Sequence, residues 1–220
     1  MKIKAVIPTL GERTEGLCAE LVGRQVDAVE LVRGLARWEA IYESWRLGLD
    51  ADVLVLLPSD MLVRPGVVQQ LVEKLKEHKA DRVSGHCRSK FRGDGSGGIS
   101  VYDTGCLPRL MRISKTLYRN SIRPESEPVV RHFKYKVFSD VMTGLHEYEL
   151  DYKEIYDRYI FQKVKHHKQV MRMVPAYQQK AVSDFDYIAV LQALESKDFS
   201  MDKKEPITNH TSIIKRYDLG

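Results

Sequence analysis

The sequence predicts an α/β fold with a mostly parallel sheet flanked by helices and a less regular C-terminal half. Through residues 1–85, short apolar segments alternate with stretches of helical spacing. One of the apolar runs, Val53–Leu57, is unbroken, as expected of a strand buried on both faces of a parallel sheet. Strand–helix repeats of this length favour parallel strands joined by helical crossovers.

The elements of the first half follow in order. Helical spacing is clearest where Ile41, Trp45 and Leu49 fall at i, i+4 and i+8, and Pro65 is well placed to begin a helix. We expect strands over 3–7, 26–32 and 53–57 and one starting at 82, with helices over 14–23, 35–49 and 67–78.

The second half is less regular. Residues 88–98 are glycine-rich and basic, and we interpret them as a loop, either a lid whose cations reach phosphates or an ordinary solvated loop. The remaining expectations are helices over 107–119, 151–164 and 185–194, a strand or hairpin arm over 129–138, a strand over 170–174 and a polar, loosely packed tail from 196. The chain is expected to form a single domain over 1–220, with halves at 1–86 and 87–195 and a tail at 196–220.

The overall composition limits the classes of protein to which the chain can belong. The 220 residues carry a formal charge of +5, which suits nucleic acid, anionic lipid or phosphate-bearing substrates alike. Three cysteines lack metal-ligand spacing and indicate reduced thiols. There is no apolar run of membrane-spanning length, and the N-terminal apolar stretch is too short for a signal peptide, so we expect a cytoplasmic protein. The basic amphipathic segment 109–119 admits peripheral contact with a membrane, although packing on the core is favoured.

The sharpest local signal is Asp60, which follows the buried strand in the segment Leu57–Gly66. Ligands of parallel sheets bind beyond the carboxyl ends of strands, so the functional residues are expected at 8–13, 33–37 and 58–64. A carboxylate there suits Mg²⁺ or Mn²⁺ bound to a diphosphate. The alternative is an aspartate that only caps the turn before Pro65.

Several of these segments together resemble family 2 glycosyltransferases. The opening Val6–Arg13, the helix end Trp45–Leu49, and Ala51–Asp60 followed by Pro65-Gly66 match that family in order and spacing. The resemblance covers residues 1–85, and 151–176 more loosely. It implies a GT-A fold, related to the Rossmann fold, and transfer of a sugar from a nucleoside-diphosphate sugar to a glycan, lipid or protein acceptor.

The resemblance also implies site residues. Asp60 matches the second aspartate of the family's D-x-D motif, the metal ligand, while Pro58 stands in place of the first. The family's acidic stretch after the second strand is replaced by basic residues, of which Arg33 or Arg37 is expected to meet phosphate. The residues assigned to the donor are Pro8, Thr9, Glu12, Arg13, Arg33, Arg37, Ser59 and Asp60.

An inverting transferase needs a carboxylate that accepts the proton of the acceptor hydroxyl. Counting back from Pro175 places Asp157 at the family's base position, with Asp151 and Glu154 as competitors. The alternative is that all three are exposed charges on an amphipathic helix. His210 is a candidate second metal ligand, since some GT-A enzymes supply a late histidine; the alternative is a solvated side chain.

Other classes of function stay open on the sequence. Pro58 leaves room for a non-catalytic module that binds a nucleotide sugar or a phosphate. A nucleotidyltransferase is disfavoured because Gly11-Glu12-Arg13 is a poor match to a glycine-rich phosphate loop. A nucleic-acid-binding protein is disfavoured because no known binding motif is recognisable. Nothing in the sequence indicates an oligomeric state.

Overall fold

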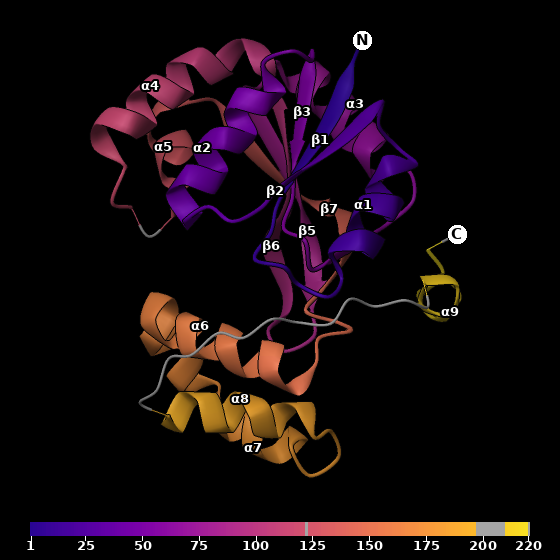
Figure 1. Ribbon diagram of the computed structural model, residues 1–220, viewed down its shortest axis with the longest axis vertical. Coiled ribbons are helices and arrows are strands. Elements are labelled where there is room, and N and C mark those ends of the chain that lie inside the picture. The colour runs from indigo at the N-terminus through magenta and orange to yellow at the C-terminus, as the bar shows by residue number, and fades with distance from the viewer. Residues whose placement is uncertain (122, 197–209, 220) are drawn as a thin grey trace. The chain divides into compact units, whose positions relative to one another are not determined.

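The computed structural model describes residues 1–121, 123–196 and 210–219 of the chain (Figure 1). Its contacts divide it into two compact units, Met1–Tyr148 with Pro206–Gly220, and Glu149–Glu205. In the part that is described, no helix is both long and apolar enough to cross a bilayer.

The first unit is built on a seven-stranded sheet in the order β2-β1-β3-β6-β5-β7-β4. The strands are β1 (Ile3–Pro8), β2 (Ala28–Val32), β3 (Val53–Leu56), β4 (Met61–Val63), β5 (Arg82–Ser89), β6 (Gly93–Asp103) and β7 (Tyr135–His146).

Five of these strands point the same way. β1 pairs in parallel with β2 and β3, and β5 pairs in parallel with β7. β6 lies antiparallel between β3 and β5, which leaves β5 and β3 in the same direction. Only β4 and β6 run the other way. The predicted α/β class with a mostly parallel sheet flanked by helices is therefore confirmed.

Helices cover both faces of this sheet (Figure 1). They are α1 (Glu15–Gly23), α2 (Arg37–Gly48), α3 (Val67–His78), α4 (Leu107–Leu117), α5 (Glu127–His132) and α9 (His210–Tyr217), with a 3₁₀ turn at Thr104–Cys106. Alternate residues of β1 show the division: Ala5 and Ile7 pack in the core with α1 and α3, whereas Val6 packs in the core with α2 and α4.

Strand β7 lies between β5 and β4. Its register against β5 shifts on both sides of His86, an irregularity that bends the strand, and its last residues, Gly144–His146, pair with β5 and β4 at once. Gly144 permits this approach, because a Cβ at that position would lie 2.1 Å from the carbonyl oxygen of Leu62. The bend brings the end of β7 beside the start of β4.

The second unit is helical, with α6 (Tyr152–Arg172), α7 (Val174–Lys180) and α8 (Asp186–Glu195). Tyr177 joins the three helices, since its ring lies 6.0 Å from that of Tyr159 and 5.9 Å from that of Tyr187. Asp151 begins α6 with a capping box: its side chain accepts the amide of Glu154, whose carboxylate accepts the amide of Asp151.

Four sequence predictions were wrong, wholly or in part. Residues 88–98 form the ends of a β5–β6 hairpin, because paired backbone holds the glycines in register. Of residues 129–138, the predicted strand is confirmed over 135–138, the start of β7, and is wrong over 129–132, which belong to α5 because Pro128 sits in the first turn of that helix. The apolar run 170–174 ends α6 and begins α7, as a short apolar run fits a buried helix equally well. The tail contains α9, whose Ile213 is buried in the core. The predicted division into halves at 1–86 and 87–195 stays a prediction.

Candidate functional site

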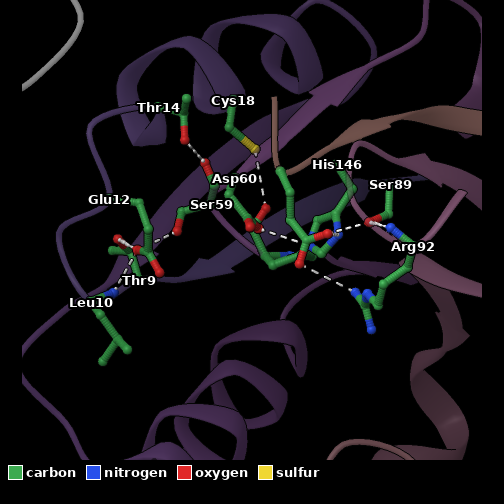
Figure 2. Close-up of polar contacts among 12 residues, drawn as sticks. Thr9, Leu10, Glu12, Thr14, Cys18, Ser59, Asp60, Ser89, Arg92 and His146 are labelled. Atoms are coloured by element: carbon green, nitrogen blue, oxygen red, sulfur yellow. Dashed lines mark hydrogen bonds and ion pairs between the residues drawn. The ribbon is translucent and has the colours of Figure 1, made fainter. Parts of the chain in front are cut away.

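The carboxyl ends of the five parallel strands lie at one edge of the sheet. The turn after β1, the turn after β3 and the end of β7 therefore meet, although they are far apart in the sequence. Figure 2 shows the polar side chains that they contribute.

Glu12 joins the first two turns. Its Oε2 accepts the hydroxyl of Thr9 at 2.8 Å, the hydroxyl of Ser59 at 2.6 Å and the amide of Leu10 at 2.8 Å. The hydroxyl of Thr14 also donates to the carbonyl of Ser59 at 3.0 Å. Of the residues predicted to bind a donor, the structure brings together Thr9, Glu12 and Ser59, and it uses Glu12 to hold the turns in place.

Asp60 follows directly and is almost fully buried, with 1% of its surface exposed. Its Oδ1 lies 3.2 Å from Nε2 of His146, the last residue of β7. The strand register explains the contact, because Met61 pairs with His146 across β4 and β7. The carboxylate of Asp60, just before β4, and the imidazole of His146, at the end of β7, thus meet at the carboxyl edge of the sheet, where these two antiparallel strands pair.

A second carboxylate lies near the other ring nitrogen of His146. Glu147 is fully buried, and its Oε2 lies 3.7 Å from Nδ1 of His146. The hydroxyl of Ser89 donates to Oε2, and a guanidinium nitrogen of Arg92 lies 3.5 Å from Oε1 (Figure 2). Glu147 has φ +66, a left-handed conformation that is uncommon for a side chain of this size. His146 is therefore flanked by two buried carboxylates.

Sequence reasoning missed His146, Glu147 and Ser89. Arg92 lies in the turn between β5 and β6, within the segment that the sequence predicted to be a loop. The signal available was weak: three polar residues at the ends of strands, two of them in a segment with no clear alternation. Their meeting depends on the bend of β7, which the sequence does not display.

Two thiols near the site are held in the neutral form. Burial raises the pKa of Cys18, and the nearby carboxylate of Asp60 raises it further. Burial raises the pKa of Cys87 to about 11, against the opposing effect of Arg92. Neither thiol is therefore poised as a nucleophile near neutral pH.

The predicted phosphate-binding arginines are committed to ion pairs. Arg33 lies 2.9 Å from Glu15, whose other oxygen accepts the hydroxyl of Thr9 at 2.8 Å. Arg33 is thus linked to the first turn. Arg37, at the start of α2, pairs with Glu125 at 3.0 Å. Pro8 ends β1, and Arg13 lies half-buried in the loop that follows.

The other predicted site residues have partners elsewhere. Nδ1 of His210 lies 2.6 Å from Glu20 on α1, and this contact holds the pKa of Glu20 below its usual range. Within the described parts of the chain, no three or more His, Cys, Asp or Glu side chains are arranged to hold a metal ion. The assignment of a metal to Asp60 and His210 stays a prediction.

The predicted bases lie in the second unit. Asp151 is engaged in the capping box of α6. Asp157 is buried, not exposed, and lies 3.7 Å from Lys153 one turn earlier. The role of either residue as catalytic base stays a prediction.

A comparison with protein-family models finds no match, and a comparison with curated proteins finds none either. Among solved structures, the chain is similar to A197 from STIV, with 20% identity and a TM-score of 0.42 over 50% of this chain and 68% of that one. It is also similar to the 4-diphosphocytidyl-2C-methyl-D-erythritol synthase of Anaerococcus prevotii, with 12% identity and a TM-score of 0.49 over 68% and 91%. A third is a glycosyltransferase involved in glycosylation of the PBCV-1 major capsid, with 11% identity and a TM-score of 0.47 over 66% and 93%. Since these TM-scores lie below 0.5, the function proposed below rests on the residues of the site itself.

Proposed function

We propose that the chain is a glycosyltransferase that binds a nucleoside-diphosphate sugar at the carboxyl edge of the sheet and transfers the sugar to an acceptor hydroxyl. The observation that carries the proposal is the buried Asp60, placed beside His146 and next to the turn that Glu12 holds. Buried carboxylates that are not needed for packing concentrate at functional sites.

We infer that the site takes a divalent cation. Asp60 would supply a carboxylate oxygen, a ligand that suits Mg²⁺ or Mn²⁺, and His146, whose Nε2 lies 3.2 Å from Asp60, would supply an imidazole nitrogen. Glu147 lies on the other ring nitrogen of His146, the arrangement that orients metal-binding histidines. When bound, such an ion neutralises the diphosphate and so stabilises it as a leaving group. On this proposal His146 takes the part that the sequence assigned to His210.

The remaining residues bind and orient the donor. The turn of Pro8–Arg13 lies against Ser59, so a nucleoside bound to that turn has its diphosphate directed toward Asp60. The position of the family's first D-x-D aspartate is held by Pro58, whose carbonyl accepts the thiol of Cys18 at 3.5 Å. His146 and Glu147 offer a different source of polar groups beside Asp60.

The transfer step itself uses the acceptor hydroxyl as nucleophile. Its oxygen forms a bond to the anomeric carbon while the bond from that carbon to the diphosphate oxygen breaks, with inversion. The hydroxyl proton passes to a carboxylate, for which Asp157 is our candidate, and the nucleoside diphosphate leaves with the bonding electron pair. The low exposure of the Asp157 carboxylate supports the choice over Asp151, which caps its helix.

The proposal is tested by thermal-shift titration with UDP and GDP in the presence of Mn²⁺. We expect a rise in melting temperature for the wild type that is lost in Asp60→Asn and His146→Ala. Asp140→Asn, an exposed aspartate of the same sheet, is the matched control and should respond as the wild type does. No shift with any nucleoside diphosphate, or an equal shift in Asp60→Asn, would refute the donor site.

Turnover separates a transferase from a module that only binds. Slow hydrolysis of UDP-sugars and GDP-sugars, followed by release of the free nucleotide, is expected of the wild type. Binding without hydrolysis, and without transfer to any acceptor, would favour the non-catalytic module.

A further inference from the structure

A cavity lies at the amino edge of the sheet, opposite the candidate donor site and beside the first residue of the chain. Its volume is about 650 Å³, within the range of small-molecule sites. It lies between the end of α3 and the start of α4, and the six-residue β1 spans about 17 Å from this edge to the carboxyl edge. The cavity is therefore separate from the candidate donor site.

Cations line this cavity from both sides. Lys76 and Lys79 come from the last turn of α3 and its cap, and Arg109 comes from the first turns of α4. Among the described residues, none of the three forms an ion pair. This is unlike the neighbouring Lys74, which lies 3.6 Å from Glu77.

Arg109 contacts an aromatic ring. Its guanidinium carbon lies 5.0 Å from the centre of the Phe133 ring, which also lines the cavity. A cation–π contact leaves the guanidinium its charge and its N–H donors, which suit the oxygens of an anion. Arg109 therefore favours an oxyanion as the ligand.

The carboxylates that line the cavity accept hydrogen bonds from backbone amides. Asp52 accepts the amide of Lys2 at 2.6 Å, Asp81 accepts that of Lys134 at 2.7 Å, and Asp103 accepts that of Gly105 at 2.8 Å. Each of these aspartates fixes a chain segment at the sheet edge. They offset part of the positive charge: Asp52 lies 3.9 Å from the N-terminal ammonium of Met1, which also lines the cavity. Among the described residues, none of the three aspartates pairs with Lys76, Lys79 or Arg109.

The residues around α4 add positive charge near the cavity. Residues 104–124 contain no aspartate or glutamate and include Arg112, Lys115 and Arg119 besides Arg109. Uncompensated like charges repel one another, and a bound polyanion relieves that repulsion. The field also draws anions toward the cavity.

We propose that the amino-edge cavity binds a phosphate-bearing ligand, held by Lys76, Lys79 and Arg109. The phosphoryl group is the recognised chemistry, whether it belongs to a free metabolite or to a lipid headgroup. This site does not depend on the glycosyltransferase proposal, because it shares no residue with the carboxyl edge.

The test for a free ligand is calorimetric titration of the full chain with sodium pyrophosphate, in EDTA to exclude divalent metal. We expect binding by the wild type and by Asp60→Asn. Removal of one charged hydrogen-bond donor should weaken it about tenfold, in Arg109→Gln and in Lys79→Gln. Arg112→Gln is the matched control, since it removes the same charge one turn along α4, outside the cavity lining.

The lipid source is tested by co-sedimentation with phosphatidylcholine vesicles, with and without phosphatidic acid. Binding that requires phosphatidic acid, and that Arg109→Gln weakens more than Arg112→Gln, supports the site with a lipid headgroup as its ligand. Pyrophosphate binding with the same residue dependence supports a free ligand. The proposal is overturned if neither probe binds, or if Arg112→Gln reduces binding as much as Arg109→Gln, because the effect would then be one of general charge.

Discussion

The link between Glu12 and Ser59 is the contact on which the candidate donor site most depends, and its strength is measurable. Glu12→Ala removes an acceptor shared by two hydroxyls and one amide. The Leu10 amide is exposed and is taken up by water, and the Thr9 hydroxyl still has Glu15. The hydroxyl of Ser59, on a residue only 1% exposed, is left without this acceptor.

The expected loss of stability follows from what happens to each of these three hydrogen-bond donors. A buried hydroxyl that loses its charged acceptor costs about 1–3 kcal/mol, and the loss of the exposed bonds adds little, so Glu12→Ala should lower the free energy of unfolding by about 1–3 kcal/mol. Ser59→Ala alone removes one donor and should cost about 1 kcal/mol. The double variant should cost less than the sum by about 1–2 kcal/mol, because both single changes break the same bond.

Urea unfolding at neutral pH, followed by circular dichroism, measures all three free energies. Glu39→Ala combined with Ser59→Ala is the control cycle, since Glu39 is an exposed residue of α2. That pair should be additive within about 0.5 kcal/mol. Additivity of Glu12→Ala and Ser59→Ala to the same degree would show that the two turns are not held by this bond, and would refute the reasoning.

Three further outcomes are expected. Gly144→Ala should lower the free energy of unfolding by at least about 2 kcal/mol in urea, because its Cβ would lie 2.1 Å from the Leu62 carbonyl oxygen; a loss near zero would contradict the close pairing of β4 and β7. Hydrogen bonds from lysines, chiefly Lys4, lower the pKa of Asp50 from 3.8 to about 2, so its stabilising effect is complete above pH 3.8 and is lost as the pH falls toward 2. The stability difference between wild type and Asp50→Asn should shrink over that interval in acid titrations, and a constant difference would count against the pairing. Asp151→Ala should cost about 1 kcal/mol through loss of the helix cap, with donor turnover retained; lost turnover with unchanged stability would reverse its assignment.

The first half of the fold could be predicted from the sequence because its periodicities are strong and local. The run Val53–Leu57 reads as a buried strand, and β3 covers most of it. Helix α3 begins and ends where Val67–His78 was expected, since Pro65-Gly66 marks its start. The position of Asp60 at the carboxyl edge followed from that order of elements alone.

The second half could not be predicted in the same way, because its structure depends on distant contacts. The glycines of β6 favour a loop locally, yet Gly93 and Gly95 pair with β5, and Ser100–Asp103 farther along the strand pair with β3. His146 and Glu147 reach the site through the irregular end of β7, where Gly144–His146 pair with both β5 and β4. Gly144 allows the close approach of β4. No local pattern in 135–147 encodes which strands it joins.

The free energy lost by burying charged side chains at the carboxyl edge of the sheet indicates that they are kept for function. Burial of a carboxylate is unfavourable unless ion pairs and hydrogen bonds offset it, and Asp60 and Glu147 are both buried within reach of the same histidine. Glu147 also adopts a left-handed backbone, a further cost of about 1–3 kcal/mol. A core formed by apolar residues would be at least as stable without these groups. Because the unfavourable features gather at the end of the sheet where ligands of parallel strands bind, a binding role explains them better than a structural one.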